Sequence, residues 1–154
     1  MSRLYEKGDV QMVGFLIAIL SGALMSIQGV FNTAVTKSSS IWVANGFVQA
    51  TAFAVCLGAW LFVDRSNIGD LLTVKPKYML LGGVIGAFIT FTVIKSMEML
   101  GPSKAIMFII ISQLIVAYGI ELMGLFGVDK QNFEWKKVVG MAVAIIGIAV
   151  FKWD

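Results

Sequence analysis

The fold of this chain is decided by residues 78–127, which read YMLLGGVIGAFITFTVIKSMEMLGPSKAIMFIIISQLIVAYGIELMGLFG. Two apolar stretches flank the short segment LGPS at 100–103, and each is long enough for a helix that crosses a hydrocarbon core of roughly 30 Å. Proline is well tolerated in the first turn of a helix, where its missing N–H costs little. The pattern therefore predicts two membrane-spanning helices joined by a tight turn.

The composition of the whole chain agrees with a membrane protein. Of the 154 residues, 58% are hydrophobic and 14% are charged, and the mean hydropathy is +0.89. A soluble domain has roughly 45–50% apolar and about 25% charged residues. The chain has no His and one cysteine, Cys56, so we expect no disulfide, no metal site and no cofactor.

Five apolar segments divide the chain. We predict an all-α integral membrane protein, a single membrane domain over residues 1–154, with five transmembrane helices at about 10–31, 41–63, 78–100, 102–127 and 137–151. Tryptophans bracket two of these segments, as expected of side chains at the membrane interface: Trp42 and Trp60, and Trp135 and Trp153.

The basic residues are distributed unevenly between the connecting segments. One side of the predicted membrane has eight, Arg3, Lys7, Arg65, Lys75, Lys77, Lys130, Lys136 and Lys137, and the other has three, Lys37, Lys104 and Lys152. The positive-inside rule then places the N-terminus in the cytoplasm and, after five spans, the C-terminus outside a bacterial cytoplasmic membrane. Since the net charge of +3 follows these loops, we expect membrane lipid and no nucleic acid as a partner.

Small residues recur at helical spacing. Gly82, Gly86 and Thr90 lie four residues apart, and Gly140 and Ala144 repeat the pattern. Faces of this kind let transmembrane helices approach closely. They predict either packing within one chain or a surface between two chains.

Two pairs of amides lie within apolar segments. Gln28 and Asn32 are four residues apart, as are Asn45 and Gln49, so each pair lies on one helix face. An amide in hydrocarbon needs a hydrogen-bond partner. The pairs are therefore either hydrogen-bonded between helices or part of the polar wall of a substrate cavity.

Charged residues also lie within the predicted spans. Lys95 can reach the interface with its long side chain or pair with Glu98, three residues further on. Glu121 shares a helix face with Gln113, and Tyr118 flanks that face. A desolvated carboxylate can carry a proton or bind a cation, so Glu121 is a candidate coupling residue, the alternative being a structural ion pair. Gln113 is a candidate for substrate contact or for helix packing.

Several of these motifs resemble one family. Residues 28–32, QGVFN, resemble the Q-G-x-x-N element of the YdcZ-type branch of the drug/metabolite transporter superfamily. The glycines of 82–86 and the segment LGPSKA at 100–105 are similar to its glycine-rich span and L-G-x-x-x-A turn. The most specific match is SQLI at 112–115, with Glu121 eight residues after Gln113 and GLFG at 124–127.

The resemblance implies a five-span half-transporter that pairs with a second copy or a paralogue to form ten spans of inverted halves, with the substrate site between them. It makes Gln28, Asn32, Gln113 and Glu121 the motif positions. The family tends to have Asp, sometimes followed by His, where this chain has Glu121 and Leu122, which argues against a proton relay between two adjacent groups. A uniform charge bias also disagrees with an antiparallel homodimer, so dual insertion, an inverted paralogue and a parallel dimer remain alternatives.

The sequence therefore predicts a secondary transporter, and not an enzyme, that exports a small metabolite or organic compound. The chain contains no G-x-x-x-x-G-K-[ST] motif, so ATP is not expected as the direct energy source. The alternative is a non-transporting membrane subunit that assembles or regulates a larger complex. Glu121 favours a cation as substrate, whereas Lys95 favours an anion or zwitterion, and the sequence leaves the substrate open.

Overall fold

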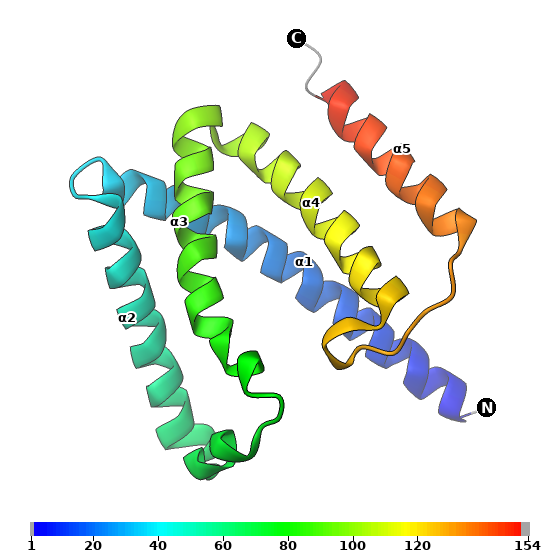
Figure 1. Cartoon of the computed structure of the whole chain (residues 1–154), viewed down its shortest axis with the longest axis horizontal. Coiled ribbons are helices and arrows are strands. Elements are labelled where there is room, and N and C mark those ends of the chain that lie inside the picture. The colour runs from blue at the N-terminus through cyan, green and yellow to red at the C-terminus, as the bar shows by residue number, and fades with distance from the viewer. Residues whose placement is uncertain (1, 152–154) are drawn as a thin grey trace.

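The computed structural model describes the backbone of residues 2–151 and the side chains of residues 10–151. Every regular element in this part of the chain is a helix, which confirms the predicted all-α class (Figure 1). The five α-helices are α1 (Ser2–Thr36), α2 (Ile41–Ala59), α3 (Gly82–Leu100), α4 (Pro102–Met123) and α5 (Trp135–Phe151). Single turns of other helix types lie at Trp60–Asp64, Ile68–Thr73, Lys77–Leu81 and Leu125–Gly127.

Four segments of the described chain are long and apolar enough to cross a membrane, namely Val10–Thr36, Ile41–Asp64, Lys77–Leu100 and Pro102–Met123. Helix α5 is not among them, because its 17 residues extend only about 25 Å at a rise of about 1.5 Å per residue. The chain is thus an integral membrane protein by the length and composition of its helices. The fifth span stays a prediction.

Local sequence explains where the helices begin and end. The Ser40 side chain caps α2 by accepting a hydrogen bond from the Val43 N–H at 3.2 Å. Gly101, at φ 79°, turns the chain between α3 and α4, and Pro102 opens α4. Gly124, at φ 64°, ends α4 in the left-handed conformation that glycine adopts without a steric penalty.

The end of α4 differs from the sequence prediction. The fourth span was expected to run to residue 127, whereas α4 ends at Met123 and a short turn, Leu125–Gly127, follows it. Gly124, the first of the two glycines in GLFG, already takes the left-handed conformation and ends the helix. The sequence did not indicate this helix end, because Leu125 and Phe126 continue the apolar segment. Glu121 consequently lies two residues from the end of the helix.

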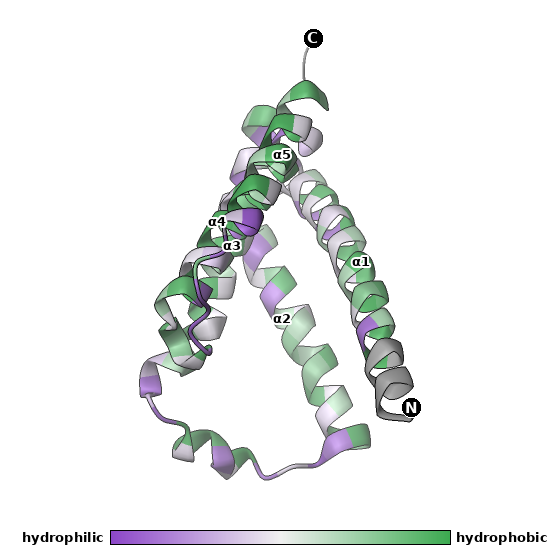
Figure 2. Cartoon of the chain, turned by 90° about the vertical axis from the view of Figure 1, so that its right-hand side faces the viewer, coloured by the Kyte–Doolittle hydropathy of each residue, from purple (hydrophilic) through white to green (hydrophobic). Residues whose placement is uncertain are grey.

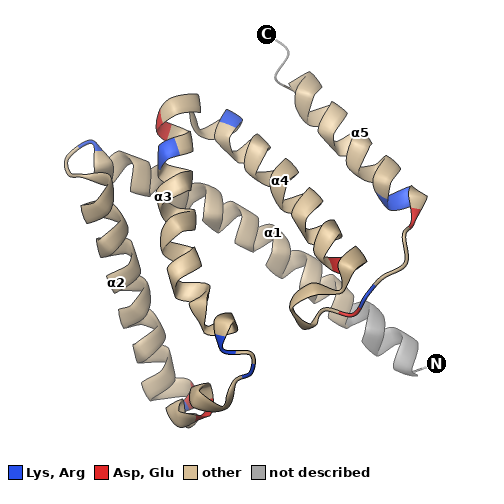
Figure 3. Cartoon of the chain, in the orientation of Figure 1, with Lys and Arg blue, Asp and Glu red and all other residues tan. Residues whose placement is uncertain are grey.

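Helix α3 is the central element of the arrangement. It packs against α1, α2 and α4, and α5 packs against α4. The connections alternate between two ends: the N-terminal end of α1 lies at the same end of the molecule as the 60–81 and 124–134 segments, opposite the turns at 37–40 and 101 (Figure 1). Figure 3 shows that the charged residues gather at these ends and connections, whereas the middles of the helices carry none.

The surface of the chain is far larger than that of a soluble monomer. Its accessible area is 12177 Å² for a mass of 16.7 kDa, against about 7,600 Å² for a soluble protein of that mass. Among the described residues, the buried hydrophobic side chains are only Ala44, Ile94, Met97 and Ala105. Hydrophobic residues predominate along the helices (Figure 2), and most of their large side chains are exposed, as a lipid environment requires.

The glycines of α3 do not mediate close packing within the described chain. A Cβ atom added at Gly82, Gly83 or Gly86 would meet nothing within 4 Å, and the same holds for Gly140. The close approach occurs instead between α1 and α3, where a Cβ on Gly29 would lie 2.5 Å from Met97 Cε. The small-residue face of α3 is therefore free to contact lipid or another chain.

One predicted amide pair forms a joint between α2 and α3. The Asn45 side chain is 3% exposed, and its Nδ2 donates to the Ala87 carbonyl at 2.8 Å. Gln49 Nε2 donates to Thr90 Oγ1 at 3.3 Å, so both amides bridge the two helices. Trp42 stacks on Phe91 at the same joint, with ring centroids 4.8 Å apart.

The joint predicts a stability difference between two polar residues of α2. We expect Asn45→Ala to lower the free energy of unfolding by about 1 kcal/mol, because it removes an interhelical hydrogen bond inside the membrane. Thr51→Ala is the matched control, since the Thr51 hydroxyl donates only within its own helix, to the Phe47 and Val48 carbonyls. Equilibrium unfolding in mixed detergent micelles measures both, and equal stability of the two variants would contradict the assignment.

Candidate functional site

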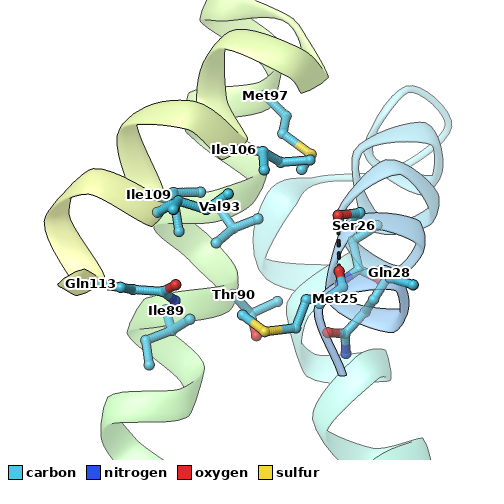
Figure 4. Close-up of a pocket in the computed structure, with 15 residues that line it drawn as sticks. Met25, Ser26, Gln28, Ile89, Thr90, Val93, Met97, Ile106, Ile109 and Gln113 are labelled. Carbon is cyan, nitrogen blue, oxygen red and sulfur yellow. Dashed lines mark hydrogen bonds between the residues drawn. The ribbon is translucent and has the colours of Figure 1, made fainter. Parts of the chain in front are cut away.

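A pocket of about 320 Å³ lies between α1, α3 and α4 (Figure 4). Its size falls at the lower end of the range of about 300–1,000 Å³ that is usual for small-molecule sites. Its lining residues come from α1 (Gly22, Ala23, Met25, Ser26, Gln28, Gly29, Asn32), α3 (Ile89, Thr90, Val93, Met97) and α4 (Ile106, Ile109, Ile110, Gln113).

The polar groups of the pocket converge from three helices. Gln28 lies on α1 and Gln113 near the centre of α4, and Figure 4 shows them on opposite sides of the pocket with Thr90 of α3 between them. Ser26 also lines the pocket, with its hydroxyl donated to the Gly22 carbonyl at 3.0 Å. The membrane-crossing helices α1, α3 and α4 thus present amides and hydroxyls to one pocket.

The amides in this pocket lack hydrogen-bond partners. Within residues 10–151, no hydrogen bond involves the side chains of Gln28, Asn32 or Gln113, in contrast to Asn45 and Gln49 at the α2–α3 joint. Gln28 and Gln113 are exposed within the single chain. Asn32 is only 8% exposed as a whole residue, yet its amide atoms keep some accessible surface, and the residue lines the pocket. Unpaired amides in a membrane interior are costly, and a polar ligand or water in the pocket removes that cost.

The contact of Gly29 with Met97 shapes one side of the pocket. A Cβ on Gly29 would lie 2.9 Å from Met97 Sδ and 3.3 Å from Val93 Cγ1. Met97 also lines a second cavity of about 350 Å³, toward Lys37, Glu98 and the α3–α4 turn. The glycine of the QGVFN element therefore allows α1 and α3 to approach closely, beside two of the three unpaired amides.

Lys95 and Glu98 lie outside the pocket, near the end of α3. Their side chains pair at 3.3 Å, which confirms the predicted i, i+3 contact. Glu98 Oε1 also accepts a hydrogen bond from the Thr36 hydroxyl at 2.9 Å and so connects α3 with the end of α1. Lys95 is thus part of a contact between helix ends and does not line the pocket.

Glu121 and Tyr118 lie at the opposite end of the molecule, where α4 meets the start of α5. Glu121 Oε2 is 3.6 Å from Lys137 Nζ, and the Glu121 carbonyl accepts a hydrogen bond from the Gln131 N–H at 2.9 Å. The Tyr118 hydroxyl accepts a hydrogen bond from the Glu134 N–H at 3.2 Å. The structure thus places Glu121, 44% exposed at its side chain, in an ion pair and away from Gln113's pocket.

The eight predicted site residues thus fall into four places. Three of them, Gln28, Asn32 and Gln113, meet at the pocket, and the others form contacts between helices or helix ends. Sequence reasoning did not assign Thr90 or Met97 to a site. The spacing of Thr90 with two glycines suggested packing, and a methionine in an apolar helix gives no signal of its own.

Comparison with known families agrees with the motifs at this pocket. The family model described as "Putative inner membrane exporter, YdcZ" matches residues 13–150. The chain belongs to the YdcZ family. That match spans three of the four membrane-crossing segments in full and nearly all of the first segment and of α5, and it includes the QGVFN and SQLI segments that supply the amides. No curated protein and no solved structure matches the chain.

The Gly29 contact predicts a coupled pair of substitutions in this YdcZ-family protein. We expect Gly29→Ala to lower the free energy of unfolding by about 1–3 kcal/mol, because Met97 must leave its buried position. Adding Met97→Ala removes the clashing atoms, so the double variant loses less than the sum of the single losses.

Gly14→Ala serves as the control for helix α1. A Cβ at Gly14 would meet nothing within 4 Å, so this variant is expected to be as stable as the wild type or slightly more so. Unfolding of all four variants under identical detergent conditions provides the comparison. Additive losses for Gly29→Ala and Met97→Ala would disprove the contact.

Proposed function

We propose that this chain is half of a secondary transporter that exports a small metabolite or organic compound, which it binds in the pocket between α1, α3 and α4. One observation carries the proposal: three amides without a hydrogen bond in the described chain, Gln28, Asn32 and Gln113, line one pocket between membrane-crossing helices. A subunit that only assembles other proteins needs no such group, since amides without a partner destabilise a membrane interior. Membership of an inner membrane exporter family supports the direction of transport.

We further propose that the working unit is a pair, formed with a second copy or an inverted paralogue, in which each chain crosses the membrane five times. The large apolar surface and the small-residue face at Gly82, Gly83 and Gly86 support this pairing, because they find no partner within the described chain. In this arrangement the two halves rock around a fixed central site. The charge bias supports a cytoplasmic N-terminus and a C-terminus outside.

Coupling to an ion gradient is assigned to Glu121. Within the four membrane-crossing segments of the described chain, the carboxylates are Asp64, Glu98 and Glu121. Glu121 is the one that bonds α4, which carries Gln113, to the start of α5 through Lys137. Protonation of Glu121 removes its charge and hence this ion pair, so it is able to change the position of α4 without touching the substrate.

Transport is tested with proteoliposomes that are loaded with a metabolite extract and given a proton gradient. We expect the wild type to release at least one compound faster than protein-free vesicles, as measured by mass spectrometry of the external medium. Gln113→Leu should slow that release by about tenfold, the effect of losing one hydrogen bond to the substrate.

Thr92→Val is the matched control for this experiment. Thr92 lies two residues from Thr90 on α3, but its hydroxyl donates to the Phe88 and Ile89 carbonyls of its own helix and it does not line the pocket. It should leave the release unchanged. If no compound leaves the proteoliposomes faster than it leaves loaded, protein-free vesicles, the protein is the non-transporting subunit instead.

The role of Glu121 is tested by comparing Glu121→Gln with Lys137→Gln. Both variants remove the partly exposed Glu121–Lys137 ion pair, and Lys137→Gln also removes the contact of Lys137 with Glu134 at 3.8 Å. Each should lower stability by less than about 1 kcal/mol. If Glu121 carries the proton, only Glu121→Gln abolishes the dependence of flux on the pH gradient, whereas Lys137→Gln retains it. Equal behaviour of the two variants would show that Glu121 is a structural partner alone.

A further inference from the structure

We infer that the compound bound between α1, α3 and α4 is electrically neutral, with an apolar body and one amide-like or hydroxyl group that both donates and accepts hydrogen bonds. This inference rests on the proposed function, since it names the substrate class of the same pocket. It differs from the expectation drawn from Lys95 and Glu121, which favoured an ion.

The lining of the pocket contains no charge. Its polar groups among the described residues are the amides of Gln28, Asn32 and Gln113 and the hydroxyls of Ser26 and Thr90. Burying an ion in an apolar site without a countercharge is far more costly than burying an amide that gains hydrogen bonds. A pocket of this composition therefore favours a neutral compound over an ion of the same shape.

The charged residues near the lining residues in sequence lie outside the pocket wall. Lys37, five residues after Asn32, lines the neighbouring cavity that Met97 shares. Lys95 is paired with Glu98 at 3.3 Å, at the end of α3. Glu121 pairs with Lys137 at 3.6 Å, where α4 meets α5. Lys104 lines a different cavity, with residues of α4 and α5. None of them belongs to the pocket wall, so none serves there as the countercharge for an ionic substrate.

The amides determine which neutral group binds. Each side-chain amide provides an NH₂ donor and a carbonyl acceptor, so amides on opposite walls suit a ligand group with both functions. No hydrogen bond within residues 10–151 occupies the three amides, so both functions are available to a ligand.

The remaining walls suit an apolar body of variable shape. Ile89, Val93, Ile106 and Ile109 provide aliphatic surface, and Met97 provides a flexible thioether at the side toward α1. Methionine adapts to different shapes because it is unbranched and polarizable. The pocket thus discriminates strongly against charged ligands and only weakly between ligands of different shape.

Three probes that share one body separate charge from shape. The probes are 4-phenylbutanamide, 4-phenylbutyrate and 4-phenylbutylamine, isotopically labelled, and their equilibrium binding is measured with the full chain in lipid nanodiscs. We expect the neutral amide to bind at least about tenfold more tightly than either ion, and Gln113→Leu to remove that advantage.

A charged variant provides the converse test. Gln113→Glu places a carboxylate in the pocket wall. It should raise the affinity for 4-phenylbutylamine by about tenfold and lower the affinity for 4-phenylbutyrate. Thr92→Val, outside the pocket, should bind all three probes as the wild type does.

Two results would overturn the inference. One is an ion that binds as tightly as the amide in a manner that depends on Gln113, and the other is an amide whose binding is unchanged by Gln113→Leu. Binding and flux are measured separately, so the two proposals fail separately. If the amide binds but is not transported, the result contradicts the proposed transport. If an ion is exported and its export depends on Gln113, the result contradicts only the proposed substrate class.

Discussion

The structure depends on one constraint: a polar group inside the membrane needs a hydrogen-bond partner from the protein or a ligand, because no water is available to bond it there. Asn45 and Gln49 satisfy this constraint with α3, and by doing so they fix α2 against it. The side chains of Gln28, Asn32 and Gln113 form no hydrogen bond within the described chain. The same chemistry thus serves packing on one side of α3 and the proposed binding site on the other.

The central position of α3 explains how the two uses are kept apart. Thr90 accepts a hydrogen bond from Gln49 while it also lines the pocket, so this one residue belongs to both the joint and the site. On the pocket side, Gly29 lets α1 approach Met97 closely. The α2–α3 joint therefore supports the α3 wall of the pocket, and the contact of α1 with Met97 sets the width of the pocket.

Much of the fold could be predicted from the sequence, because span length, the turn at Gly101 and Pro102, and the all-helical class depend on local composition. The site could be predicted only in part. Gln28 with Asn32 and Asn45 with Gln49 give the same signal in sequence, yet one pair lines a pocket and the other bonds to α3. Only the crossing of the helices distinguishes them. The depth of Glu121 was uncertain for a different reason, since either glycine of GLFG was able to end α4.

The pocket also supports the proposed pairing of two chains. It is bounded by three helices only, and the accessible area of 12177 Å² leaves nearly every large side chain exposed. Lipid tails cover an apolar surface well, but they offer no hydrogen bond to an unpaired amide. A second polar-lined half can both close the open side and present matching groups to a bound compound. The three unpaired amides are therefore the strongest physical reason, within this chain, for the proposed pairing.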